Sequence, residues 1–194
     1  MSQTTAEYIW LLGVVAWFLI RLPHQVRSAK EPIRVRARGV REAVLLAILT
    51  AGLWVIPAVY VLTGLPRLGD YGFLSAVGWI GTAVLVASLW LFYRSHRDLG
   101  RHWSFTLDIR ENHKLVTTGI YARIRHPMYA SFLLLGLAQA LLLPNWFAGP
   151  AGLVAAAVLT MFRVRHEEAL MLREFGDEYR SYVRGTRRVI PWLI

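Results

Sequence analysis

Five apolar runs separated by polar segments are the feature that most constrains the fold of this 194-residue chain. A helix needs about 20 apolar residues to cross a hydrocarbon core roughly 30 Å thick, and these runs reach or approach that length. A composition of 56% hydrophobic and 18% charged residues does not suit an ordinary soluble protein. The sequence therefore predicts an all-α integral membrane fold with about five transmembrane helices. We expect them at Ala6–Ile20, Ala43–Thr63, Gly72–Tyr93, Met128–Leu143 and Trp146–Phe162.

The placement of the 22 Lys and Arg residues predicts how these helices are oriented. Seven of the cations lie in residues 21–41, seven in 94–125 and seven in 163–188, whereas the loop between the second and third runs has Arg67 alone. Cytoplasmic loops carry the excess of positive charge. We therefore expect a multi-pass protein of the cell membrane, with its N-terminus outside and its C-terminus in the cytoplasm. Membrane topology also accounts for the net charge of +10, so nucleic-acid binding is not expected.

The absence of cysteine excludes disulfides, thiolate metal sites and a thiol nucleophile. The first apolar run lacks a basic segment before it and a small-residue cleavage site after it, so we expect a retained helix and not a signal peptide.

We divide the chain into residues 1–93, with three transmembrane helices and a basic cytoplasmic loop, and residues 94–194, the candidate catalytic region. In the second part we expect a cytoplasmic loop, a tight helical hairpin and an amphipathic helix bent near Gly176.

The hairpin is predicted from small residues and from its turn. Small side chains recur at every fourth position, which lets another helix approach closely; they are Ala148, Gly152, Ala156 and Thr160. The partner would be the preceding helix, through Gly136 and Ala140. A two-residue turn at Pro144-Asn145 would then place the start of the fourth helix beside the end of the fifth.

The stretch RIRHPMYAS, residues 123–131, begins the fourth helix. Pro127 suits the first helical turn, where its missing N–H costs nothing. The unpaired N–H groups of that turn, flanked by Arg125 and His126, could bind an anion such as a carboxylate. The alternative is that cations at a cytoplasmic helix end only anchor it at the interface, which requires no ligand.

The end of the fifth helix offers the opposite charge. Arg163 and Glu167 lie four residues apart and share a helix face, where they either extend to the interface or form a ligand site. The predicted hairpin brings Arg125, His126, Arg163 and Glu167 together. Such a mixture of charges suits a zwitterionic ligand, and we expect no metal site because the spacing of zinc-binding helices is absent.

Three segments in order carry a family resemblance: HKLVTTGIYARIRHPMY, then FRVRHEEALMLREFGDEYRSY, then RRVIPW. Together they resemble the isoprenylcysteine carboxyl methyltransferase family, in a minimal archaeal or bacterial form, over residues 106–192. The RHPxY element by itself is weaker, since phospholipid methyltransferases and sterol reductases have similar elements.

The resemblance implies methyl transfer from S-adenosylmethionine to the carboxylate of a lipophilic, isoprenylcysteine-like substrate that enters from the bilayer, with S-adenosylhomocysteine as the product. It assigns Arg163 to the substrate carboxylate and makes Arg163 and Glu167 the catalytic residues. Thr106 stands where some relatives have glutamine, so the chain departs from the family there. The implied cofactor-binding residues are His113, Lys114, Leu115, Val116, Tyr121, Arg125, His126, Pro127, Met128 and Glu167.

Three other functions remain open at this point. One is a phospholipid N-methyltransferase, with the same cofactor and a different acceptor. Another is a sterol-reductase-like enzyme that uses NADPH. The last is a membrane scaffold or small-molecule carrier without catalytic activity, which would not depend on the cytoplasmic charges.

Overall fold

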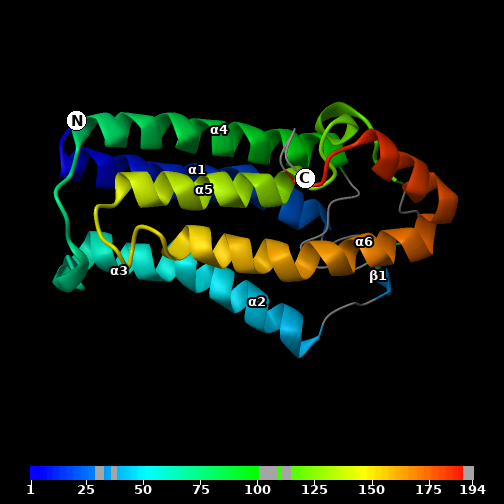
Figure 1. The fold of residues 1–194 in the computed structure, drawn as a ribbon, viewed down its shortest axis with the longest axis horizontal. Coiled ribbons are helices and arrows are strands. Elements are labelled where there is room, and N and C mark those ends of the chain that lie inside the picture. Colours follow the sequence, from blue (N-terminus) through cyan, green and yellow to red (C-terminus); the bar gives the residue numbers. More distant parts are fainter. Residues whose placement is uncertain (29–32, 36–38, 101–108, 111–114, 190–194) are drawn as a thin grey trace.

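The computed structural model describes residues 1–28, 33–35, 39–100, 109–110 and 115–189, and it shows a bundle of long helices (Figure 1). Two short strands, β1 (Ile33–Val35) and β2 (Ile109–Arg110), pair antiparallel at one end of the bundle. Two 3-10 turns, η2 (Arg67–Gly69) and η4 (Gly119–Ala122), lie in connecting segments. The helices are α1 (Gln3–Ser28), α2 (Val40–Thr50), the π-helical turn η1 (Ala51–Val55), α3 (Ile56–Thr63), α4 (Ser75–Leu99), α5 (Pro127–Leu142) and α6 (Ala151–Gly185).

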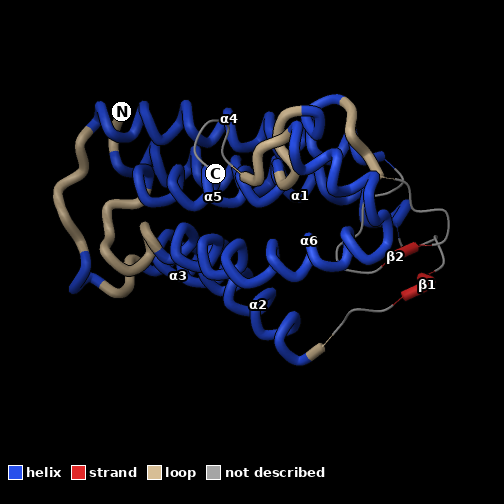
Figure 2. Tube along the Cα trace, turned by 45° about the vertical axis from the view of Figure 1, so that its right-hand side comes forward, coloured by secondary structure: helices blue, strands red, loops and turns tan. Residues whose placement is uncertain are grey.

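The helices form two layers (Figures 1 and 2). One layer contains α1, α4 and α5, and the other contains α6 with the rod formed by α2, η1 and α3. Helix α5 joins the layers because it packs against both α4 and α6. Aromatic rings fill the core, where Trp17 stacks on Phe92 at a centroid distance of 4.9 Å and Phe132 lies beside both.

The expected all-α membrane class is confirmed. In the part of the chain that the structure describes, three helical segments are long and apolar enough to cross a membrane by length and composition, namely residues 3–26, 40–63 and 75–99. Helix α5 is apolar but has only 16 residues, or about 24 Å. The apolar part of α6 ends at Phe162, and the rest of this helix is charged. That α5 and α6 also cross the bilayer stays a prediction.

The rod formed by α2, η1 and α3 bends where a proline removes a hydrogen-bond donor. Pro57 has no N–H to offer the preceding turn, and the residues before it widen into the π-helical turn η1. Gly52 lies in this turn, and a Cβ atom there would be 2.5 Å from the carbonyl oxygen of Ala151. The absence of a side chain therefore lets the rod pack directly against the start of α6.

The predicted two-residue turn between the last two helices is wrong. Helix α5 begins at Pro127 as expected, but residues 143–150 form the connection and α6 begins at Ala151 instead of Trp146. Asn145, fully buried, organises this connection. Its amide nitrogen donates to the carbonyl of Pro66 and to Asp70, and its oxygen accepts from two backbone N–H groups. The longer turn is thus built together with the loop before α4, which periodicity in the sequence does not reveal.

Close packing of the hairpin at small residues is confirmed. A Cβ atom at Gly136 would lie 2.4 Å from the backbone nitrogen of Leu153, and one at Gly152 would lie 2.8 Å from the side-chain oxygen of Gln139. The Gln139 amide in turn donates to the carbonyls of Gly52 and Ala148. Helices α5, α6 and η1 are therefore held at backbone contact.

We expect Gly136→Ala to destabilise the bundle by roughly 1–3 kcal/mol, because the added methyl group overlaps backbone that cannot yield without separating α5 from α6. The measurement is the apparent thermal unfolding temperature in detergent. Gly185→Ala is the matched control, since a Cβ atom there would meet no atom of the described residues within 4 Å. Equal unfolding temperatures for the two variants would show that the close approach does not stabilise the fold.

Candidate functional site

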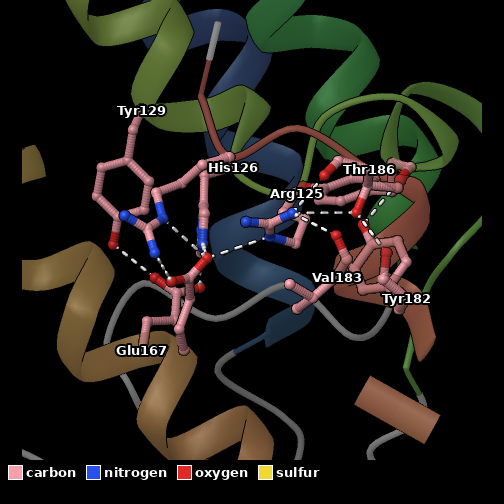
Figure 3. Close-up of polar contacts among 10 residues, drawn as sticks. Arg125, His126, Tyr129, Glu167, Tyr182, Val183 and Thr186 are labelled. Atoms are coloured by element: carbon pink, nitrogen blue, oxygen red, sulfur yellow. Dashed lines mark hydrogen bonds and ion pairs between the residues drawn. The ribbon is translucent and has the colours of Figure 1, made fainter. Parts of the chain in front are cut away.

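Charged side chains gather at the end of the bundle where α5 begins (Figure 3). Glu168 on α6 is their centre. Its carboxylate accepts from Nε of Arg125 at 3.1 Å and from Nη2 of Arg188 at 2.7 Å, and Nε2 of His126 lies 3.4 Å away. We call these four residues the Glu168 cluster.

The pKa of Glu168 reflects these neighbours. Burial raises it, but the His126 ring and the Arg188 guanidinium favour the ionised carboxylate and together lower the pKa to about 2. The carboxylate is therefore charged at neutral pH. It offsets two guanidinium groups that would otherwise repel each other at the start of α5.

The cluster exists because the chain folds back after Gly176. The expected bend is confirmed at this residue, whose φ of 51° suits glycine, and it returns the end of α6 to the start of α5. The N–H groups of Arg125 and His126 then donate to the carbonyls of Arg187 and Arg188, at 2.8 and 2.9 Å. A backbone pairing between two distant segments thus fixes the direction of both side chains.

Arg125 is held on several sides. Besides Glu168, its guanidinium donates to the backbone carbonyls of Val183 and Thr186, and its side chain is only 8% exposed. Figure 3 shows the guanidinium directed toward these groups. Its carboxylate partner is thus Glu168, and not Glu167 with which we expected it to converge. This arrangement suits a residue that holds the backbone of residues 183–186 against the start of α5.

Glu167 has a different environment from its neighbour. The Tyr129 hydroxyl donates to its Oε2 at 2.6 Å, and Nδ1 of His126 lies 4.0 Å from Oε1. Its side chain is 28% exposed, about twice the exposure of Glu168. One hydrogen bond therefore orients the carboxylate while part of it remains accessible to a ligand.

The N-terminus of α5 lies beside the Glu167 carboxylate, because His126 and Tyr129 at the start of this helix both approach that carboxylate (Figure 3). Pro127 occupies the first turn, and the side chain of the N-cap residue, His126, makes no capping hydrogen bond. The N–H groups of that turn carry partial positive charge and can donate hydrogen bonds to an anion. An acidic group and an anion-binding helix end thus lie side by side, which suits a ligand with both an ammonium and a carboxylate.

Arg163 lies one turn before Glu167 on α6 and reaches in another direction. Its Nη2 is 3.3 Å from Oε1 of Glu42 on α2, and both side chains are about nine-tenths buried. The charges of Arg163, Glu42 and Glu167 all act on the Tyr129 hydroxyl. Tyr129 therefore connects the Glu167 side of the site with the Arg163–Glu42 ion pair.

A cavity of about 200 Å³ opens beside this ion pair, between α2 and α6. Its wall combines apolar side chains with a cluster of charges, which suits an amphipathic ligand. The lining residues are Gly39, Arg41, Glu42, Leu45, Phe162, Arg163 and His166.

The remaining predicted residues occupy several places. His113, Lys114 and Thr106 lie outside the described residues. Leu115 and Val116 are half-buried, as is Met128, whereas Pro127 is fully buried.

Tyr121 is buried on η4, and burial raises the pKa of its hydroxyl above the ordinary value. The carbonyl of Tyr121 accepts a hydrogen bond from Tyr182, so the bent end of α6 also secures η4. This contact holds the Tyr121 backbone in place at the same end of the bundle as the Glu168 cluster.

Sequence reasoning missed four contributors to the site: Glu42, Tyr129, Glu168 as the centre of the cluster, and Arg188. Tyr129 and Glu168 stand within the motifs quoted above, and that position in the sequence is the signal that could have identified them. Arg188 stands in the RRVIPW segment without a role of its own. Glu42 lies outside every motif, and no sequence signal indicated it.

Comparison with known proteins identifies relatives of this chain. The model of the family described as "Phospholipid methyltransferase" matches residues 76–178, more than half of the chain. A rice protein named "Probable protein-S-isoprenylcysteine O-methyltransferase" (Oryza sativa subsp. japonica) is 32% identical over 136 residues, which cover 66% of each chain, slightly under two thirds of the relative's length. The "Protein-S-isoprenylcysteine O-methyltransferase" of Schizosaccharomyces pombe is 38% identical over 86 residues, 43% of this chain and 35% of that protein.

A solved structure has the same fold. It is described as the eukaryotic intramembrane Ras methyltransferase ICMT (isoprenylcysteine carboxyl methyltransferase), and it matches with a TM-score of 0.54 and 20% sequence identity. The match covers 81% of this chain and 55% of that one. These relatives confirm the resemblance to isoprenylcysteine carboxyl methyltransferases, and that the chain is a minimal archaeal or bacterial form stays a prediction.

Proposed function

Because this chain belongs to the phospholipid methyltransferase family, we propose that it is a membrane enzyme that uses S-adenosylmethionine to methylate a carboxylate on a lipophilic, isoprenylcysteine-like substrate. One observation carries the proposal. A partly exposed carboxylate, Glu167, and a buried guanidinium, Arg163, lie one helical turn apart beside the uncapped start of α5. These groups complement a zwitterionic cofactor and an anionic acceptor.

The residues around Glu167 fit S-adenosylmethionine. Glu167 would bind its ammonium group, and the first turn of α5 at Pro127 and Met128, with His126, would bind its carboxylate. Leu115, Val116 and Tyr121 offer apolar contacts for the adenine, and the family resemblance adds His113 and Lys114. Arg125 would act indirectly, by holding the Glu168 cluster together. When bound, S-adenosylmethionine supplies an electrophilic methyl group on a positively charged sulfur.

Arg163 would orient the acceptor carboxylate. A carboxylate is already ionised at neutral pH, so its attack on a methyl group requires no strong general base. Alignment of the two reactants can contribute roughly 7–11 kcal/mol, and exclusion of water leaves the carboxylate less solvated. Leu45 and Phe162 in the cavity wall would contact the lipid part of the acceptor, which reaches them from the bilayer.

We place the charged end in the cytoplasm of the cell, with the N-terminus on the opposite side, from the positive-inside rule.

The test is calorimetric titration of the detergent-purified protein with S-adenosylhomocysteine and, separately, with NADPH, followed by a methyl-transfer assay. We expect S-adenosylhomocysteine to bind, NADPH not to bind, and N-acetyl-S-farnesylcysteine to accept a methyl group. Preferential binding of NADPH would contradict the proposal and favour a reductase. Methylation of the amine of a phospholipid, with none of the carboxylate, would favour a phospholipid N-methyltransferase. Binding of neither ligand would favour a scaffold or carrier.

A further inference from the structure

We infer that Glu42 is a positioning residue for the acceptor carboxylate, which holds Arg163 in place and limits how tightly Arg163 binds the acceptor. This inference rests on the proposed function, in which Arg163 receives that carboxylate. It extends the site to α2, in the part of the chain before residue 93 and outside the stretch matched by the family model.

The geometry supports a direct action of Glu42 on Arg163. The two side chains approach to 3.3 Å from different helices, and both line the cavity between α2 and α6. Arg41, the neighbour of Glu42, donates to the carbonyl of Phe162 on α6. Helix α2 is therefore fixed against α6 at the position where its carboxylate meets the guanidinium.

Burial makes this interaction strong enough to influence a ligand. Charges attract and repel each other more strongly in a protein interior than in water. Arg163 lies close enough to another buried cation, Arg21, for the two positive charges to act on each other. An acceptor carboxylate that reaches Arg163 therefore experiences the positive charges of Arg163 and Arg21 and the opposing charge of Glu42, with Arg41 also in the cavity wall.

This balance has a consequence for catalysis. Strong binding of the reactant carboxylate lowers KM but does not raise kcat unless the transition state is bound more tightly still. A carboxylate loses negative charge as its oxygen forms the new bond to the methyl carbon. Without the charge of Glu42, the guanidinium would therefore stabilise the ground state more than the transition state, and Glu42 reduces that difference.

A residue with only a packing role would behave differently. Loss of such a residue would weaken all ligands or lower stability, and it would not tighten the binding of one charged acceptor. The distinguishing measurement compares a carboxylate with its own neutral methyl ester, because the two share the lipid and differ in charge.

We test the inference with Glu42→Gln in the 194-residue protein. The affinity for S-adenosylhomocysteine is measured first, and the acceptors are then titrated into protein saturated with it. Calorimetry gives the Kd of N-acetyl-S-farnesylcysteine and of its methyl ester. We expect the carboxylate to bind about tenfold more tightly than in wild type, the size of effect that loss of one nearby charge produces at an intermediate dielectric. The ester and S-adenosylhomocysteine should bind within twofold of wild type. In turnover assays, KM for the carboxylate and kcat should both fall.

Glu42→Asp and Glu178→Gln complete the design. The aspartate keeps the charge, so it should retain the wild-type ratio of carboxylate to ester affinity, and this comparison remains possible if the glutamine variant does not fold. Glu178 is exposed on the far part of α6, and its variant should match wild type. If Glu42→Gln folds and its ratio of carboxylate to ester affinity equals that of wild type, the inference is overturned. If Glu42→Gln does not fold, a Glu42→Asp ratio different from wild type would overturn it. Failure of the wild-type protein to methylate the carboxylate would instead overturn the proposed function.

Discussion

Glu167→Ala is expected to lower the affinity for S-adenosylhomocysteine at least 100-fold, with little change in the thermal stability of the protein without ligand. In the proposed site this carboxylate is the acidic partner of the ligand's ammonium group, and a charge-assisted hydrogen bond lost in a partly buried site costs a few kcal/mol. The fold should tolerate the change because Glu167 is partly exposed and, among the described residues, its close hydrogen bond is to Tyr129. Calorimetry in detergent measures the affinity, and thermal unfolding measures the stability.

Two further variants sharpen this prediction. Tyr129→Phe removes the hydroxyl that orients Glu167 and keeps its charge, so we expect a smaller loss of affinity, on the order of tenfold. Glu178→Gln alters an exposed carboxylate on the same helix and should bind normally. An affinity for S-adenosylhomocysteine that survives Glu167→Ala would remove this residue from the cofactor site and require another partner for the ammonium group.

Glu168→Gln is expected to destabilise the protein by up to about 3 kcal/mol, although this residue would not contact the ligand directly. The variant leaves Arg125 and Arg188 close together without the carboxylate that now accepts from both. The returning segment after Gly176 should then separate from the start of α5. The measurement is the apparent unfolding temperature, together with protease sensitivity of residues 176–189.

The Glu168 carboxylate should also make the stability of the fold depend on pH. Its pKa falls from the ordinary 4.5 to about 2 in the folded protein, so the folded state binds fewer protons than the unfolded state between these values. The stabilisation is complete above pH 4.5 and is lost as the pH falls from 4.5 toward 2. Wild type should therefore lose stability over this range, and Glu168→Gln should lose less. Parallel pH profiles for the two proteins would contradict the assignment.

Several local features of the fold follow from the sequence because their causes are local. Apolar runs of membrane length determine the class, since a buried backbone must satisfy its hydrogen bonds within a helix. Pro127 marks the start of α5 because it lacks an N–H, and Gly176 marks the bend of α6 because it tolerates a positive φ. The small residues of the hairpin likewise predict close packing, which is confirmed at Gly136.

The elements that the sequence did not reveal depend on contacts between distant segments. Asn145 lengthens the hairpin turn because its partners, Pro66 and Asp70, come from another loop. The two adjacent glutamates take different partners because successive helical residues point about 100° apart. Sequence order alone does not say which of them faces Arg188.

The sequence alone is therefore enough to predict a helical membrane protein with one charged end, where acidic and basic side chains lie close together. How those charged side chains pair is visible in the folded bundle alone: Glu168 pairs with Arg125 and Arg188, Glu167 with Tyr129, and Arg163 with Glu42. The physical reason is that helix periodicity and turn chemistry act over a few residues, whereas an ion pair between helices depends on where the whole bundle places both partners.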